Sequence, residues 1–477
     1  MKDRPHVLPA QSRREFLQRA GFGFGAMAFS YLLGQEARGE NVRMDPVNPL
    51  SPRPPHVRAR AKSIIWLFME GGPSHLDLFD PKPELDRLAG QPMPASFGRP
   101  ITAMGTANNT LMAPQRKWKQ HGKSGIWVSD WLPNVAQHAD DLCVIRSCWA
   151  DGLNHVGSVC QMNTGDILAG RPSLGSWATY GLGSANQNLP TFVIMADGAE
   201  PVGGPKNWSS GFLPATFQGT SFRTDGTPIF HLKPPGSVSD RQQRSKLDLL
   251  NSLNRHFAAD KAEDTELAAR LNSYELAYRM QASAPEAVDL GQESEATKKL
   301  YGIGEKETDK YGTICLQARR LVERGVRFVQ CYSGSNSGWD AHGDVEENHG
   351  RLCKASDKPI AGLLADLKGR GLLEDTLVIW GGEFGRTPFN EKGRGRDHNP
   401  WGFTIWMAGG GVKAGTVYGT TDEIGLRAVD GRAHVHDIHA TILHLLGLNH
   451  EKLTYLHNAR DERATVNGGE VIQDILA

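Results

Sequence analysis

The stretch LEDTLVIWGGEFGRTPF, from Leu373 to Phe389, decides the fold. Its residues Thr376–Trp380 are apolar or nearly so, and they lead into two glycines and then a single acid, Glu383. A continuous apolar run of this length is typical of a strand that is buried on both faces of a parallel sheet. The stretch therefore predicts a buried strand that ends in a glycine turn and presents one carboxylate at its carboxyl end.

Five further segments share this apolar character and are predicted to be strands. They cover residues 63–69, 141–149, 189–196, 325–333 and 402–411. Helical patterns precede two of the strands, at residues 313–325 and 359–373. Alternating helices and strands with short connections predict an α/β fold, a doubly wound, mostly parallel sheet with helices on both faces. A polar, helical segment over about residues 237–300 interrupts this alternation and is predicted to be a helical insertion.

The chain has 477 residues and no net charge, with 53 basic and 53 acidic side chains. This balance gives no electrostatic reason to expect nucleic acid or an anionic membrane as a partner. The six cysteines form no Cys-x-x-Cys pair, which argues against a zinc site made of thiolates. They are either buried free thiols or, in an exported protein, partly disulfide-bonded, for example Cys143 with Cys148.

The amino terminus has the pattern of a twin-arginine export signal. Arg13 and Arg14 precede a weakly apolar run that is rich in glycine and alanine and too short to span a membrane. We therefore expect the twin-arginine translocation machinery to recognise residues 1–40, with a linker at residues 41–60 and the α/β domain at residues 61–477. The mature protein is expected to be periplasmic or extracellular, without a transmembrane helix. A basic amphipathic helix is the alternative interpretation of the first residues.

Polar side chains follow four of the predicted strands or directly precede a fifth, near the sheet edge where active sites of open α/β folds lie. These polar residues are Glu70, Asn154, His155, Asp340, His342, Glu383, Arg386, Asp397, His398 and Asn399. Carboxylates and imidazoles that converge from separate segments can bind a divalent metal ion. Taken alone, each also has a structural explanation, such as a turn cap for Asp340 or a buried core position for His398. A second histidine-rich tract, residues 434–450, is predicted to be mainly a buried helix capped by Asp437.

The order of these motifs resembles the alkaline phosphatase and sulfatase superfamily. PIAGLLADLKGRGLLEDTLVIWGGEFGRTP is similar to the helix and strand that lead to its Ser-Asp-His-Gly motif. GRDHNPWGFTIWMAGGGVKAG is similar to the segment that follows, with its metal-binding histidine. A closer resemblance is to an exported bacterial family, domain of unknown function 1501, whose members are often labelled sulfatase-like. The motifs that carry it are MEGGPSHLDLFDPKP, NHVGSVCQMNTG, GRPSLGSW, GWDAHGD, GGEFGRTP and GRDHNPWGF.

This resemblance implies an alkaline phosphatase-like fold with a divalent metal ion, zinc in the first place and manganese or calcium as alternatives. The residues that would hold the ion are Glu70, Asp340, His342, Glu383 and His398. Phe384 stands where the superfamily has a further histidine, and Asn154-His155 stand where it has a nucleophile. The chain also has no C-x-P-S-R segment for making formylglycine, so an ordinary arylsulfatase mechanism is not expected.

Two classes of function follow. The first is a metal-dependent hydrolase of a phosphate, sulfate or related anionic ester, with metal-activated water in place of a side-chain nucleophile. In it His155 is a general acid or base or a further ligand, while Asn154, Arg386 and Asn399 contact the substrate. The second is a non-catalytic descendant of the fold that binds a polysaccharide or a protein. Metal-dependent isomerisation is a third interpretation, because fold alone does not fix the reaction.

Overall fold

The computed structural model describes residues 40–41, 45, 48–224, 228–229, 238–258, 265–334 and 336–477. Apart from Glu40, the predicted export signal at residues 1–40 lies outside the described residues. Among the described helices, none combines the length and apolar character that a membrane crossing requires.

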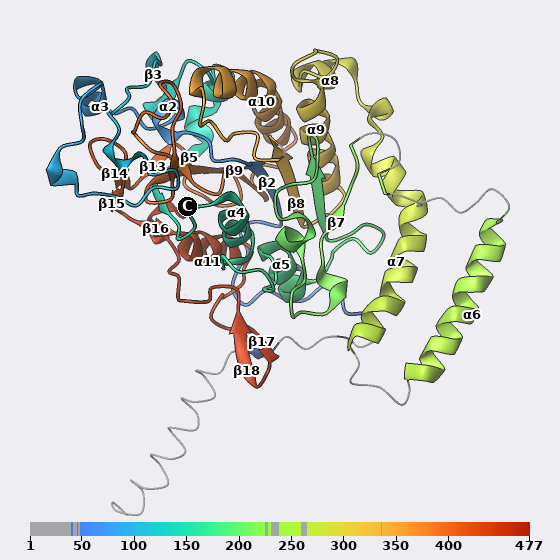
Figure 1. The fold of residues 1–477 in the computed structure, drawn as a ribbon. Helices are drawn as coiled ribbons and strands as arrows, with labels where there is room; N and C mark the ends of the chain where they lie inside the picture. Colours follow the sequence, from blue (N-terminus) through green and yellow to red (C-terminus); the bar gives the residue numbers. More distant parts are fainter. Residues whose placement is uncertain are drawn as a thin grey trace, which may run out of the picture.

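A central sheet of nine strands organises the described part of the chain (Figure 1). Its order is β13 (Thr416–Tyr418), β5 (Leu142–Trp149), β12 (Phe403–Ala408), β9 (Thr376–Gly381), β2 (Ser63–Met69), β8 (Phe328–Ser333), β6 (Phe192–Ala196) and β7 (Thr220–Ser221), with β16 (Ala433–His434) also beside β5. All neighbours pair in parallel except β12, which runs antiparallel to β9 and β5. The predicted α/β fold with a mostly parallel sheet is confirmed, and each of the six predicted strands is present.

Helices cover both faces of this sheet. Successive residues of β2 alternate between two hydrophobic cores: Ile65, Leu67 and Met69 lie in one, and Ile64, Trp66 and Phe68 lie in the other. The first core is closed by α9 (Asp309–Glu323) and α10 (Val345–Gly369), and the second by α4 (His155–Thr164), α5 (Leu174–Leu182) and α11 (Val435–Leu445) (Figure 1). Burial on both sides explains why these strands read as continuous apolar runs.

The three central parallel strands end at the same level. Phe68 of β2 is in register with Tyr332 of β8 and with Gly381 of β9. The residues that follow these strands therefore meet at one edge of the sheet, where ligands bind in open α/β folds.

The predicted insertion contains α6 (Asp240–Ala258), α7 (Thr265–Val288) and α8 (Glu295–Leu300). Figure 1 shows α6 and α7 side by side beyond β7, with α6 farther from the sheet. Met280, Ala284 and Ala287 of α7 join the first core, so this helix is anchored to the body of the protein.

Short elements complete the described chain. They are β1 (Glu40–Asn41) with β17 (Leu453–His457) and β18 (Arg460–Arg463), β3 (Trp118–His121) with β4 (Ile126–Ser129), β10 (Gly385–Arg386) with β11 (His398–Asn399), β14 (Thr420–Thr421) with β15 (Ala428–Asp430), and the helices α2 (His75–Leu78) and α3 (Pro83–Arg87). All six cysteines are buried free thiols, the first of the two alternatives given by the sequence.

Two helix starts differ from the sequence prediction. α10 starts well before Pro359, which lies inside it, because Asp344 caps an earlier start by accepting a hydrogen bond from the backbone N–H of Glu347 (3.1 Å). In α11 the N-cap is His434 rather than Asp437. Asp437 lies three residues later, where its Oδ2 accepts a hydrogen bond from the His434 N–H (2.7 Å) and closes a capping box.

Candidate metal centre

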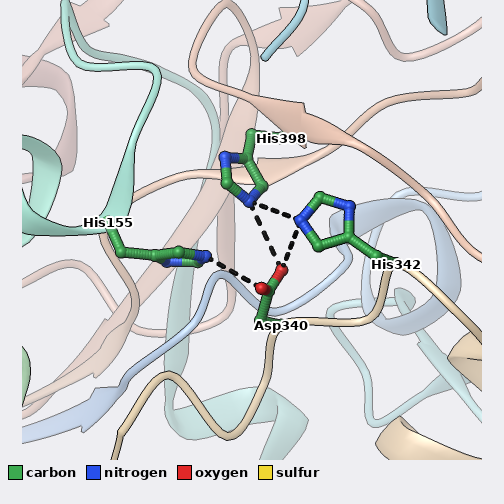
Figure 2. A group of neighbouring side chains, drawn as sticks. All are labelled: His155, Asp340, His342 and His398. Carbon is green, nitrogen blue, oxygen red and sulfur yellow. Dashed lines mark hydrogen bonds and ion pairs between the residues drawn. The ribbon is translucent and has the colours of Figure 1, made fainter. Parts of the chain in front are cut away.

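Four side chains from three separate parts of the chain converge beside the sheet: His155, Asp340, His342 and His398. One potential ligand atom from each lies within 4.8 Å of the others. Figure 2 shows the three imidazoles directed toward the Asp340 carboxylate. His155 opens α4 after β5, Asp340 and His342 lie between β8 and α10, and His398 lies in β11 between β9 and β12. The cluster therefore depends on the fold and not on any local sequence motif.

Asp340 is the centre of the group. Its Oδ1 lies 3.0 Å from Nε2 of His342 and 3.3 Å from Nε2 of His398. Its Oδ2 lies 3.2 Å from Nε2 of His155. The Asp340 side chain is 25% exposed, more than any of the three histidine side chains, so the group opens toward solvent at the carboxylate.

The outward nitrogen of each imidazole is already occupied by an acceptor. His155 Nδ1 lies 2.7 Å from Oε1 of Glu383, His342 Nδ1 lies 2.6 Å from Oε2 of Glu391, and His398 Nδ1 lies 2.7 Å from the carbonyl oxygen of Leu153. In a neutral imidazole, an acceptor at Nδ1 holds the proton there and leaves the Nε2 lone pair available to a metal ion. Three lone pairs and a carboxylate that face one another are a donor set suited to a divalent cation such as zinc.

The charges of the group are strongly coupled at Asp340 and His155. Burial would raise the pKa of Asp340, but the three histidines and Arg386 hold this pKa well below its ordinary value. Burial would lower the pKa of His155, but the carboxylates of Asp340 and Glu383 outweigh burial and raise it to about 9. Asp340 is therefore an anion throughout the physiological range, and cations or protons are drawn to it.

The other two histidines shift in opposite directions. The contact with Asp340, helped by Glu391, raises the pKa of His342 above its ordinary value. Burial lowers the pKa of His398, which is 5% exposed. The ring of Phe384 stacks on His398, with centroids 4.5 Å apart, so the residue that replaces the expected histidine packs against a member of the cluster.

Arg386 points into the protein. Its side chain is fully buried, with Nη2 2.7 Å from Oδ1 of Asp340. Its Nε donates to the carbonyl oxygen of Gly72 (2.9 Å), Nη2 donates to that of Gly71, and Nη1 donates to that of Arg396 (3.2 Å). Arg386 is predicted to contact the substrate, and in the structure its guanidinium positions Asp340.

Glu383 lies one layer behind the cluster, although the sequence predicts it as a ligand. It is fully buried, and its two carboxylate oxygens accept from the backbone N–H of Gly71 at 3.0 and 3.1 Å while Oε1 also meets His155. Gly71 has φ +113°, and a Cβ there would lie 2.6 Å from the backbone nitrogen of Asp340. Glycine is therefore required in the turn after β2, where the chain passes close to Asp340.

Glu70, another predicted ligand, is also fully buried and outside the group of four. Its Oε1 accepts hydrogen bonds from the backbone N–H groups of Val202 (2.7 Å) and Ser337 (3.2 Å), while Oε2 has no hydrogen-bond partner among the described residues. Burial is the main cause that raises the pKa of Glu70 to about 7, and the nearby Glu383 adds to it.

The two predicted substrate-binding asparagines have local partners. Oδ1 of the exposed Asn154 accepts from the Gly157 N–H (2.9 Å) and caps α4, which fixes where His155 begins the helix. Asn399 is fully buried, and its Nδ2 donates to the carbonyl oxygen of Gly402 (3.0 Å). Neither belongs to the group of four.

Two acids beside the cluster were not among the predicted ligands. Glu391 holds His342, and Asp397 accepts hydrogen bonds from the Met104 N–H (2.9 Å) and the Thr106 hydroxyl (2.8 Å). His342, Glu391 and Asp397 form a second group of potential ligand atoms within 4.8 Å. The sequence places Asp397 beside His398 in GRDHNPWGF but gives it no role as a ligand, whereas Glu391 follows no strand and gives no signal.

The fold and the cluster together define an α/β protein with a mostly parallel sheet and a histidine–aspartate group of metal-binding type. The chain belongs to the family described as Protein of unknown function (DUF1501), whose model matches residues 61–476. A search of curated proteins gave no match.

Solved structures of the alkaline phosphatase superfamily are similar to the chain at low sequence identity. Alkaline phosphatase from the Antarctic bacterium TAB5 is 10% identical, with a TM-score of 0.31 over 74% of this chain and 92% of that one. A sulfatase from Pseudoalteromonas sp. is 15% identical, with a TM-score of 0.34 over 82% and 68%. The lipoteichoic acid synthase LtaP from Listeria monocytogenes is 8% identical, with a TM-score of 0.37 over 84% and 76%.

Proposed function

We propose that the protein is an exported, metal-dependent hydrolase of a phosphate, sulfate or related ester. The observation that carries the proposal is the arrangement of the three histidines, each with Nδ1 held by an acceptor and Nε2 directed at Asp340. In metalloproteins, an acceptor on the ring nitrogen that does not bind the metal orients a histidine ligand and raises its basicity.

Asp340, His342 and His398 would hold the ion, with zinc the first choice and manganese or calcium the alternatives. A bound ion supplies Lewis acidity toward the ester oxygens and toward a water molecule. Arg386, which the carbonyl oxygens of Gly71 and Gly72 hold, fixes the Asp340 carboxylate, while Glu391 and Leu153 fix the two imidazoles. These residues therefore keep the donor atoms together before any ion arrives.

His155 can act either as a metal ligand or as a proton carrier. Glu383 orients the imidazole ring in both cases. Its Nε2 either completes the ligand set or exchanges a proton with the substrate. A His155→Ala variant separates them. Loss of bound metal assigns a ligand, and retained metal with lost turnover assigns the proton carrier.

No hydroxyl offers an alternative nucleophile at the start of α4. Ser158, the nearest hydroxyl, is 1% exposed, and its Oγ has no hydrogen-bond partner among the described residues. This supports attack by water, and it equally suits the second candidate function, a non-catalytic descendant that binds a polysaccharide or a protein.

The decisive experiment measures metal and turnover together on the purified full chain. Aryl phosphates, phosphodiesters and aryl sulfates are screened with added zinc, manganese and calcium. We expect a stoichiometric divalent ion and turnover that His398→Ala abolishes and His444→Ala, outside the cluster, leaves unchanged. If the purified protein contains no stoichiometric divalent ion, the metal site is wrong. If it contains an ion but hydrolyses none of the esters, the binding function is favoured.

Export is tested separately at Arg13 and Arg14. We expect the double substitution to lysine to retain the protein in the cytoplasm, because twin-arginine signals depend on the arginine pair. Unchanged secretion of the double variant contradicts this part of the proposal.

A further inference from the structure

Apolar side chains lie exposed on the two loops that border the cluster. Thirteen large hydrophobic side chains are exposed in the described part of the chain. Four of them are on these two loops, and a fifth, Val156, is in the first turn of α4. They are Ile101 (71% exposed), Met104 (57%), Val156 (54%), Ile167 (44%) and Leu168 (70%), here called the apolar rim. Single exposed hydrophobic residues need no explanation, but a group beside a candidate site does.

Hydrogen bonds tie the first loop to the cluster. The Met104 N–H donates to Oδ2 of Asp397, the residue before His398 (2.9 Å). Trp401 Nε1 donates to the carbonyl oxygen of Ile101 (3.2 Å), so this loop is held along the segment that carries His398. Met104 and Ile101 are therefore fixed beside the site while their side chains face solvent.

The second loop joins the cluster through α4. Val156 is the residue after His155, in the first turn of the helix. The carbonyl oxygen of Ile167 lies 3.6 Å from the position that a Cβ of Gly157 would take, so the loop after α4 folds back beside that first turn. Val156, Ile167 and Leu168 therefore lie on the His155 side of the group.

The composition of these loops favours an apolar ligand over a polyanion. Residues 100–115 contain no lysine, arginine, aspartate or glutamate, and the loop between α4 and α5 contains one acid, Asp166, and one cation, Arg171. A surface that recognises a polymer with a charge on every unit needs several cations along the bound chain. The rim instead offers several large aliphatic groups, which gain free energy when apolar surface covers them.

We infer that the site acts on amphiphilic esters, in which the anionic head meets the metal centre and an alkyl chain of several carbons lies on the apolar rim. This substrate class rests on the proposed function, since the head group is placed by the same cluster. The rim adds selectivity for the apolar part, because each methylene that leaves water on binding tightens the complex.

Binding of non-hydrolysable analogues tests the inference without turnover. Ethyl- and octylphosphonate, and the matching alkylsulfonates, are titrated into the zinc-loaded full chain by calorimetry below their micelle concentrations. We expect the octyl compound of at least one series to bind about tenfold more tightly than the ethyl compound, corresponding to about 1.4 kcal/mol. Met104→Ser, Val156→Ser and Leu168→Ser should each reduce this ratio several-fold.

Leu456→Ser is the matched control, because Leu456 is 57% exposed and lies in β17, outside the rim loops. It should leave the octyl-to-ethyl ratio unchanged, and all four variants should keep the melting temperature of the parent. A ratio near one in the parent, or an equal loss in the control, overturns the inference.

The outcomes separate this inference from the hydrolase itself. If short esters are hydrolysed and neither binding nor turnover depends on chain length, the hydrolase proposal stands and binding of an alkyl chain on the apolar rim is wrong. If the octyl compound binds more tightly as expected but octyl phosphate and octyl sulfate are not hydrolysed, the rim inference stands and the hydrolase proposal is wrong. If the protein floats with phosphatidylcholine vesicles, the rim substitutions abolish this flotation and the octyl-to-ethyl affinity ratio is near one, the rim binds a lipid surface and the inference is wrong.

Discussion

Nε2 of His342 lies 3.0 Å from Nε2 of His398, and both nitrogens lie within 3.3 Å of the same carboxylate oxygen of Asp340. Because Glu391 and the Leu153 carbonyl hold the opposite nitrogens, the two lone pairs face each other and repel unless a cation lies between them. In the metal-free protein this cation is a proton. The proposed metal ion would replace it.

The first prediction concerns the ligands themselves. Asp340→Asn and His398→Ala should weaken zinc binding by at least a hundredfold, because each removes a donor from the group. Calorimetry and elemental analysis measure the loss. At a zinc concentration about a hundred times the parent's Kd, the ion should stabilise the parent by about 2.7 kcal/mol, and this gain should vanish in both variants. Equal stabilisation of parent and variants by zinc would place the ion elsewhere.

The second prediction concerns Glu391, the acceptor behind His342. Glu391→Gln should weaken zinc binding by about 10- to 100-fold, since the amide no longer holds the imidazole in one tautomer with an anion. Glu374→Gln is the matched control, because Glu374 is exposed and lies in the turn before β9. Equal zinc affinity in the Glu391 variant and the parent contradicts a role for this acid in metal binding.

How far the sequence predicted the site is clearest at the strand ends. The apolar runs placed Glu70 and Glu383 at the correct edge of the sheet, because strand position follows from burial on both faces. They could not give side-chain direction, which depends on how the glycine turns after β2 and β9 fold. Both acids turn inward to backbone N–H groups. Glu383 reaches only Nδ1 of His155, whereas the loop acid Asp340 meets Nε2 of all three histidines.

The sheet was predictable for the same reason that Glu391 was not. Each strand carries its own apolar signal, so six strands could be found without knowing their neighbours. Glu391 gains its role from the hairpin between β10 and β11, where Arg386 pairs with His398 and the intervening loop brings the acid to His342. Such a contact exists only after the chain has folded and leaves no local pattern.

The third prediction concerns the buried pair Asp77–Arg396. Both side chains are fully buried, with Arg396 Nε 2.9 Å from Oδ2 of Asp77. Asp77→Asn should lower the free energy of unfolding by about 3–5 kcal/mol, because Arg396 keeps a buried charge without its partner. Chemical denaturation measures the change. Asp375→Asn, which breaks the exposed pair with Lys62, should cost about 1 kcal/mol or less.

The same pair predicts the acid limit of stability. Burial would raise the pKa of Asp77, but Arg396 and Ser74 hold it below its ordinary value of 3.8. A lowered folded-state pKa means that the stabilisation is present above the unfolded-state value and is lost as the pH falls through the folded-state pKa. The gap in stability between parent and Asp77→Asn should therefore be constant above about pH 4 and should shrink progressively at lower pH. A gap that does not shrink as the pH falls below 3.8 contradicts this linkage.

The last prediction concerns Glu70, whose pKa is shifted in the opposite direction to that of Asp77. Burial raises its pKa from 4.5 to about 7, so the folded protein binds this proton more tightly than the unfolded chain does. The resulting stabilisation is fully present below pH 4.5 and is lost as the pH rises through 7. In chelator-treated protein, the free energy of unfolding of Glu70→Gln should rise relative to that of the parent by up to about 3 kcal/mol between pH 5 and 8. The reason is that the amide has no charge to bury. Chemical denaturation at closely spaced pH values measures this difference, with Glu374→Gln as the exposed control. A pH-independent difference would mean that the carboxyl of Glu70 is ionised in the folded protein across the whole range, and that a cation near its unpaired Oε2 compensates its charge.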